Sequence, residues 1–418
     1  MTHLLASRPD GPLAKWRPKV KPIAKPFVMP AMFVAAITSN DPAVSNGSNM
    51  QALLDFIPLH GGIGRLPAGI FKHDMLYVSG NTELIGAGMY QTTLYCPATT
   101  TSKMQNRNPV FLGDGNRIDK RIIFRDLCLA GDPKAPIGTG IGCFDWLGIE
   151  DLRFVNCRFV GHRHFVHVPT NCDGILFDGC IFDDWGVLGK YSGPPGGREA
   201  GTAVFGWQPN WNVTFRNCLF KNGAGGGIWL DAGGGAALLE DLEFDRVSEF
   251  GVCGLPEGTL VQRITGRNVT RDDVSGHLFE IGGKHYRISE VDVADCDGVG
   301  VYLTDAQDVE ITDVTATRCN QGDPAARAMS GCIIMRTADP DPAKSSRGVS
   351  LKRVTARCPD RCTEHALSMV NFSGNPKALM QMPAMPEFDS GAPAQWVSPV
   401  GYYPSKSGVI ANEVTPHA

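Results

Sequence analysis

A short alternating pattern recurs along most of the chain. Each copy has an apolar residue, a polar one, an aromatic residue or Val, two polar residues, and then Cys or Val. The copies lie at 152–157 (LRFVNC), 175–180 (ILFDGC), 213–218 (VTFRNC), 242–247 (LEFDRV), 264–269 (ITGRNV), 291–296 (VDVADC) and 314–319 (VTATRC). A period of two predicts β-strands, because successive side chains of a strand point to opposite faces. The copies follow one another every 22 to 29 residues, apart from one interval of 38, so we expect each to begin another turn of a coil.

A second set of apolar strands lies between these copies. Its members are 143–146 (CFDW), 165–168 (FVHV), 203–207 (AVFGW), 228–231 (IWLD), 252–255 (VCGL), 278–281 (LFEI), 301–304 (VYLT), 332–336 (CIIMR) and 366–370 (ALSMV). Turns rich in Gly, Asn and Asp join the two sets, and the lack of amphipathic helices between them excludes βαβ architectures. The sequence therefore predicts an all-β fold, a parallel β-helix wound from one chain. A leucine-rich repeat is the nearest alternative, but its Leu/Asn signature is missing.

The final and third positions of the repeat predict two interior stacks. Because small Cys side chains are commonly buried, we expect a structural ladder of thiols inside the coil. This ladder would comprise Cys157, Cys180, Cys218, Cys296 and Cys319. Three positions earlier, a stack of rings would comprise Phe154, Phe177, Phe215 and Phe244.

The region before the repeats has a distinctive order of elements. Ser48 can cap a short helix over 49–57, whose apolar face comprises Met50, Leu53, Leu54 and Ile57. A Pro-Ala-Gly turn at 67–69 and the segment LIGAG at 84–88 follow. This order resembles the entry region of pectate-lyase-like right-handed parallel β-helix proteins. The resemblance implies a right-handed coil over 38–372 with a short N-terminal capping helix, an extended arm at 1–37 and a C-terminal tail at 373–418.

The resemblance also implies a function. Proteins of this superfamily act mostly on polysaccharides, as lyases, hydrolases, epimerases, fructan transferases or phage tailspikes, at sites on a long parallel sheet. The expectation is a carbohydrate substrate and cleavage of glycosidic bonds by hydrolysis or transglycosylation, without a cofactor. Trimers are frequent among such proteins, so a homotrimer is an open alternative to a monomer.

Composition narrows the partners. Lys plus Arg is 39 and Asp plus Glu is 43, which argues against a surface built to bind nucleic acid. No apolar run is long enough to predict a membrane-spanning helix. The 13 cysteines include no pair of CxxC motifs, so we expect no metal site and a reducing compartment. The basic, Pro-rich start lacks the form of a signal peptide, which favours a cytoplasmic or virion-associated location over secretion.

Polar residues of the second strand set are the candidate site. Asp231 and Glu280 are the expected catalytic pair, since two coils separate their backbones by roughly 10 Å and inverting glycosidases hold their carboxyls about 6.5–9.5 Å apart. Gly254 lies between them and is expected to leave an open floor. Residues expected to position the sugar are Asp145, His167 and Arg336, and those expected to stack on it are Trp207, Trp229 and Tyr302.

Two other groups compete for the site. Asp184 begins the longest interruption of the repeat, and long loops on rigid scaffolds often bind ligands. Lys284 belongs to a basic cluster, residues 283–287, that can neutralise a uronate and abstract its proton, as a lyase requires. An acidic calcium cluster is absent, which favours hydrolysis over elimination. The alternatives are a lyase acting on a uronate, a phage tailspike or fibre module that only binds glycan, and carboxylates that are merely solvated on the coil wall.

Overall fold

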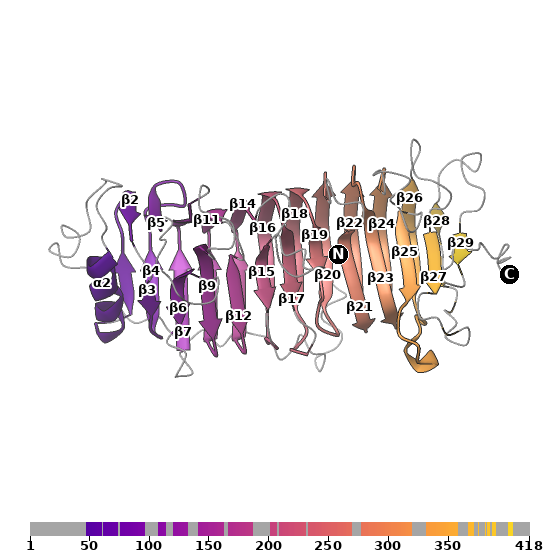
Figure 1. Ribbon diagram of the computed structural model, residues 1–418, viewed down its shortest axis with the longest axis horizontal. Helices are drawn as coiled ribbons and strands as arrows, with labels where there is room; N and C mark the ends of the chain where they lie inside the picture. The colour runs from indigo at the N-terminus through magenta and orange to yellow at the C-terminus, as the bar shows by residue number, and fades with distance from the viewer. Residues whose placement is uncertain are drawn as a thin grey trace, which may run out of the picture.

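The computed structural model describes residues 47–403, except 61, 74–75, 97–107, 114–119, 133–140, 163–165, 187–200, 207–208, 231–232, 270–276, 320–331, 358–366, 372–374, 376–380, 382, 385–386 and 390–399. Two long parallel sheets wind together along one axis (Figure 1). The predicted parallel β-helix is therefore confirmed. The expected arm at 1–37 lies outside the described residues.

Sheet A has 17 strands, and its N-terminal half has two strands in each coil. One row consists of β1 (Ile63–Arg65), β4 (Thr82–Ile85), β7 (Lys120–Arg125), β10 (Glu150–Val155) and β13 (Asp173–Asp178). The other row consists of β2 (Gly69–Lys72), β5 (Thr92–Tyr95), β8 (Cys128–Ala130), β11 (Arg158–His162) and β14 (Ile181–Trp185). Both rows then pair with one long strand, β16 (Thr214–Gly223). Single strands follow: β18 (Leu238–Val247), β20 (Leu260–Arg267), β22 (Arg287–Ala294), β24 (Glu310–Thr317), β26 (Ser350–Arg357) and β28 (Phe388–Asp389).

Sheet B has 12 strands and corresponds to the second strand set. It begins with β3 (Leu76–Val78), β6 (Asn108–Gly113), β9 (Ile141–Leu147), β12 (His167–Thr170), β15 (Thr202–Gly206) and β17 (Gly226–Leu230). It continues with β19 (Phe250–Cys253), β21 (His277–Lys284), β23 (Val299–Gln307), β25 (Ile333–Thr337), β27 (Leu367–Asn371) and β29 (Val400–Tyr403). Since β28 and β29 pair in parallel with β26 and β27, the coil continues beyond residue 372.

The first half of the interior follows the predicted stacks. Phe154, Phe177 and Phe215 are fully buried and lie parallel, with centroids 5.2 and 4.8 Å apart. Cys157 and Cys180 lie one above the other, and their thiols donate to the backbone oxygens of Phe124 and Phe154 in the preceding coil at 3.4 and 3.3 Å. Cys218 repeats this contact in the next coil at 3.5 Å. The thiols are therefore structural here, as predicted.

The predicted phase is wrong in the second half. Leu242, not Val247, lies opposite Cys218, and Phe244 stacks on Phe220 at 4.8 Å instead of on Phe215. Cys296 and Cys319 consequently belong to another interior column, which they share with Val247. The predicted five-member thiol ladder is thus two separate ladders.

Left-handed backbone at the corner of sheet A explains this slip. Asn217 has φ 54° and lies between Phe215 and Cys218, so the alternation of faces restarts and Phe215, Cys218 and Phe220 are all buried. Asn and Asp adopt this conformation more readily than most residues. The same corner recurs from coil to coil, at Asn156, Gly179, Asn217, Asp241, Arg263, Glu290, Asp313 and Arg353.

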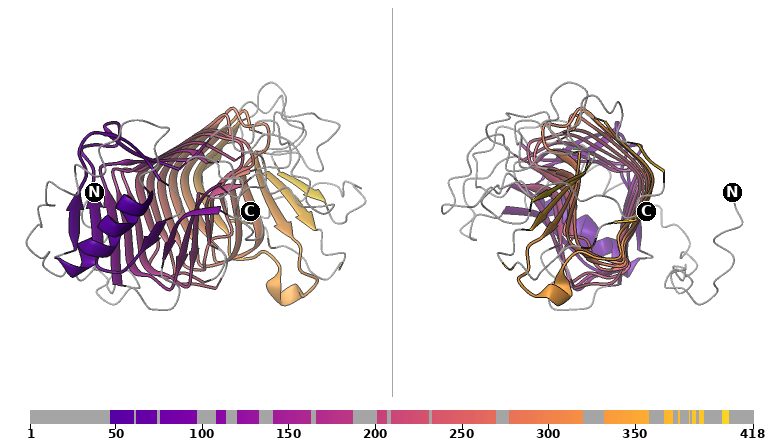
Figure 2. Two further views of the ribbon diagram at one scale, coloured as in Figure 1. Left: turned by 60° about the vertical axis from the view of Figure 1, so that its left-hand side comes forward. Right: turned by 90° about the vertical axis from the view of Figure 1, so that its right-hand side faces the viewer.

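The helix α2 (Gly47–Leu59) covers the N-terminal end of the coil, as the view along the axis shows (Figure 2). It extends two residues beyond the predicted 49–57 at each end. The four residues of its predicted apolar face are each at most 1% exposed: Met50, Leu53, Leu54 and Ile57. The helix therefore closes the hydrophobic interior, as solenoid ends require. None of the helices in the described part of the chain has the length and apolarity to cross a membrane.

Candidate active site on sheet B

One row of residues follows the outward face of sheet B. Its neighbours in register are Phe205, Trp229, Cys253, Glu280, Tyr302 and Ile334. The preceding residue on each strand belongs to the hydrophobic core, whereas Phe205 packs with Val168 in a separate small cluster. Strand alternation therefore places this row outside the coil, one residue in each rung, about 4.8 Å apart.

Glu280 is the carboxylate of this row, and its side chain is 33% exposed. The Cys253 thiol, one rung towards the N-terminus, donates to Glu280 Oε2 at 3.7 Å. Burial, and then the nearby Glu280 carboxylate, raise the pKa of Cys253 well above its usual value. Cys253 is therefore a protonated donor to Glu280 at neutral pH.

Arg336 lies two rungs from Glu280 on the C-terminal side. Its Nη2 is 3.9 Å from Glu280 Oε1, too far for a hydrogen bond, while its Nε donates to Thr304 Oγ1 at 2.9 Å. The guanidinium carbon lies 4.9 Å from the ring centroid of Tyr302. One short hydrogen bond and an aromatic face therefore hold the Arg336 side chain beside Glu280.

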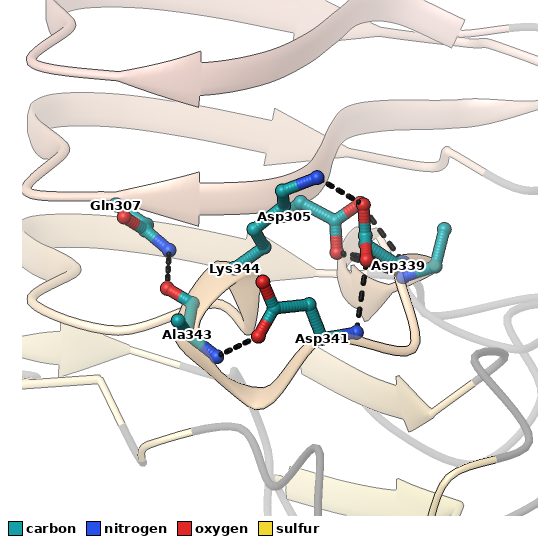
Figure 3. Close-up of polar contacts among 7 residues, drawn as sticks. Asp305, Gln307, Asp339, Asp341, Ala343 and Lys344 are labelled. Atoms are coloured by element: carbon teal, nitrogen blue, oxygen red, sulfur yellow. Dashed lines mark hydrogen bonds and ion pairs between the residues drawn. The ribbon is translucent and has the colours of Figure 1, made fainter.

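The segment after β25 holds the strand end that carries Arg336. Ser346 Oγ donates to the backbone oxygen of Arg336 at 2.9 Å. Asp305 accepts the backbone N–H groups of Ala338 and Asp339, at 2.8 and 3.2 Å. Figure 3 shows how this network continues to the short 3₁₀ turn η2 (Pro342–Lys344). The Asp339 carboxylate accepts from the backbone of Asp341 and from the side chain of Lys344. Ala343 donates its backbone N–H to Asp341 and accepts from the Gln307 side chain. A loop tied down at so many points makes the position of Arg336 well defined.

Aromatic side chains occupy the N-terminal side of Glu280. Trp229 is 38% exposed and meets the rings of Phe205 and Phe250 edge-on, at centroid distances of 5.1 and 6.0 Å. A Cβ at Gly254 would lie 2.5 Å from Trp229 Nε1, so the predicted open floor at Gly254 is wrong. The indole occupies that space and presents a partly exposed ring.

Two expected sugar contacts are buried. His167 is fully buried and packs among Phe154, Phe159 and Phe177, with its Nδ1 3.3 Å from Trp146 Nε1. It pairs in register with inward Val204, so the outward assignment of His167 is wrong.

Tyr302 does lie in the outward row, but it is only 2% exposed. Its ring stacks on His277 at 4.1 Å and contacts Arg336. Burial, together with Glu280, raises the pKa of Tyr302 to about 12 against the opposing effect of Arg336. Tyr302 therefore supports the charged pair and does not offer a face to a sugar.

Other expected residues lie elsewhere. Asp145 is in β9, five rungs from Glu280 in sheet B, or roughly 24 Å. Asp184 is exposed in β14, on sheet A. Neither is brought to Glu280, which corrects their assignment to one site. Asp231 and Trp207 lie outside the described residues.

The basic cluster at 283–287 does not form one surface. Lys284 is half-buried at the end of β21, and Tyr286 is buried with its hydroxyl donating to Gly282 O at 2.6 Å. Arg287 already belongs to β22 in sheet A. The cluster thus lacks the geometry expected for a lyase base beside a uronate-binding group. Within the described ranges no three His, Cys, Asp or Glu side chains are grouped to hold a metal ion.

Sequence reasoning missed Cys253, Phe205 and Ser346. Cys253 and Phe205 occupy outward-facing positions of their strands, and the alternation of the sequence could have indicated this. Ser346 belongs to a loop, where no periodicity indicates contacts. The described arrangement can bind a ring on Trp229, donate hydrogen bonds from Arg336 and exchange a proton at Glu280.

Comparison with known proteins supports the fold. No protein-family profile and no curated protein sequence matches the chain. Two solved structures of the Streptococcus pneumoniae surface adhesin PfbA are similar to it, at 12% identity and TM-scores of 0.61 and 0.60. They cover 81% and 91% of this chain, and 86% and 98% of the adhesin chain. The Yersinia enterocolitica family 28 exopolygalacturonase is similar at 12% identity and a TM-score of 0.53, over 91% of this chain and 78% of its own. The chain has the fold of a right-handed parallel β-helix.

Proposed function

We propose that this chain binds a glycan along the outward face of sheet B and cleaves a glycosidic bond beside Glu280. One observation carries the proposal: a partly exposed carboxylate lies between a guanidinium and a partly exposed indole, each carried two rungs away on the same sheet. An indole stacks on the apolar face of a ring, and a positioned carboxyl group exchanges protons with a leaving oxygen. These are the parts that a glycosidase needs.

Glycoside hydrolysis needs a second carboxylate, and Asp231 remains our proposal for it. It directly follows Leu230, the last residue of β17, and β17 is two rungs from β21. That separation, roughly 10 Å between backbones, suits the wider carboxyl spacing of an inverting enzyme. The similarity in fold to an exopolygalacturonase agrees with this proposal.

Glycan binding without cleavage is the second candidate. It is favoured by the partly exposed Trp229 indole and Arg336 guanidinium, which can bind a sugar without cleaving it. The similarity in fold to a surface adhesin points the same way.

The test is a screen of neutral and acidic polysaccharides for release of reducing ends, followed by Glu280→Gln and Asp231→Asn. Removing a positioned acid or base is expected to lower turnover about 10²- to 10⁴-fold. The matched control is Glu243→Gln, which alters an exposed carboxylate on sheet A and should keep full activity. Full activity in both site variants refutes the assignment of the pair. Binding without cleavage by the parent protein supports the second candidate, and an ultraviolet-absorbing unsaturated product would indicate elimination.

A further inference from the structure

The two groups of interior thiols differ in how the backbone holds them. Cys157, Cys180 and Cys218 donate to backbone oxygens of the preceding coil at 3.3–3.5 Å. The thiols of Cys296 and Cys319 contact the oxygen two residues earlier in the chain, at the longer distances of 3.6 and 3.7 Å. The backbone therefore holds the second group less closely than the first.

Cys319 lies one coil beyond Cys296. Ala294 and Thr317, each two residues earlier, pair in register, and the Cys296 N–H donates to the backbone oxygen of Arg318 at 3.2 Å. Adjacent strands are about 4.8 Å apart, and disulfides join Cα atoms that are about 4.4–6.8 Å apart. A disulfide between these two cysteines is therefore compatible with the spacing of the coils.

Cys332 is a second neighbour of Cys319, in the same coil. It directly precedes β25, which follows β24 along the chain. A Cβ at Gly300 would lie 3.1 Å from Cys319 Sγ and 3.2 Å from Cys332 O, so the lack of a side chain at Gly300 makes room for both cysteines. Hydrogen bonding with the thiols of Cys296 and Cys332, and then burial, raise the pKa of Cys319 well above its usual value. Cys319 is therefore the shared member of two thiol pairs.

Burial decides when these three thiols can react. Cys296, Cys319 and Cys332 are each 0% exposed. The reactive species in disulfide exchange is the thiolate, and it must reach the sulfur that it attacks. The folded coil keeps the three thiols protonated and away from a dissolved oxidant, whereas an incompletely wound chain exposes them. Their redox state is then set while the chain folds.

We propose that Cys319 is the shared member of an internal disulfide, with Cys296 or Cys332 as its partner, which forms when the chain folds in the presence of a small-molecule disulfide such as oxidised glutathione. One cysteine thiolate attacks the oxidant and releases half of it as a thiol. The second thiolate attacks this mixed disulfide and releases the other half. Two cysteine thiols thus lose two protons and two electrons, and the oxidant becomes two thiols. The third cysteine remains a thiol, and its thiolate can replace the partner by attacking the sulfur of Cys319.

The test is refolding of the full chain from urea with either reduced or oxidised glutathione. Acid quenching, alkylation of free thiols and peptide mapping by mass spectrometry then identify the disulfides. With oxidised glutathione, we expect most molecules to hold a disulfide that contains Cys319. The folded, reduced protein should form this bond at a rate about tenfold lower or less, because its thiols are covered.

Variants test whether Cys319 is the shared member. Cys296→Ala and Cys332→Ala should each keep a disulfide between Cys319 and the remaining partner, and Cys319→Ala should lose both pairings. Cys180→Ala is the matched control, since it removes a fully buried thiol of the first group and should leave the Cys319 disulfide unchanged. The disulfide map of the parent protein tests the proposal without any variant.

Stability adds a second readout. The oxidised parent protein should unfold at a higher urea concentration than the reduced one, because a cross-link restricts the unfolded chain, and Cys319→Ala should lack this difference. A map in which no disulfide contains Cys319, equally fast oxidation of the folded and the unfolded protein, or a lower urea midpoint for the oxidised form overturns the proposal.

Discussion

The ring stack inside the coil makes a quantitative prediction for Phe177→Ala. Phe177 is fully buried between Phe154 and Phe215, with ring planes inclined by 12° and 9°. Truncating a buried Phe to Ala costs about 3–5 kcal/mol through lost transfer energy and the cavity left behind. Two stacked neighbours place this site near the upper half of that range, since each aromatic contact contributes about 0.5–1.5 kcal/mol beyond buried area. We expect a loss of about 4 kcal/mol, close to a thousandfold in the unfolding equilibrium.

The measurement is urea unfolding followed by tryptophan fluorescence, approached from the folded and from the unfolded side. The midpoint should fall while the dependence on urea stays unchanged. Phe177→Leu is the matched control and should cost about 1.5 kcal/mol, because it keeps most of the volume. Exposed Glu243→Ala should stay within about 0.5 kcal/mol of the parent. A loss below about 1 kcal/mol for Phe177→Ala would show that the rings are not stacked in the core.

Three further predictions concern protonation and the site. Burial lowers the pKa of His162 to about 4, despite its contact with Leu129 O. Between pH 6.5 and 4 the unfolded state therefore binds a proton that the folded state does not, and the free energy of unfolding should fall by about 3 kcal/mol over this range. The variant His162→Gln should show a smaller fall when unfolding is measured against pH. Gly254→Ala, at φ 59° and against the Trp229 indole, should cost about 1–2 kcal/mol and weaken glycan binding, whereas unchanged affinity would mean that the indole is not part of the site. Thiol-labelling kinetics should show slow modification of Cys253, because its pKa is raised. A bound glycan should block this modification. The variant Cys253→Ser should lose the corresponding kinetic phase.

The repeat was sufficient to predict the fold but not its phase. Alternation and spacing indicate how many strands wind and where they begin, because both follow from which residues can be buried. They do not reveal a residue in the left-handed conformation such as Asn217, after which the order of inward and outward side chains shifts by one position. Phe215 and Phe220 therefore fit the repeat equally well, and Phe244 was assigned to the wrong one.

The placement of the candidate residues on the outward face of sheet B was also predicted only in part. Glu280, Trp229 and Arg336 lie on one face as expected, because strand parity within sheet B is regular there. His167 was misplaced because a histidine reads as polar in a pattern, although its ring packs among phenylalanines. Parity also cannot indicate that Tyr302 is covered by its neighbours, since burial on the outer face depends on side chains from other rungs.

The helix across the first coil has a consequence for assembly. Every strand of the coil offers hydrogen-bonding groups to the rung beyond it, so an uncovered first rung would accept the last rung of another molecule, and the molecules would join into filaments. The apolar face of α2 covers that rung. The 13 residues of this helix therefore disfavour the end-to-end addition of a second molecule at the first rung.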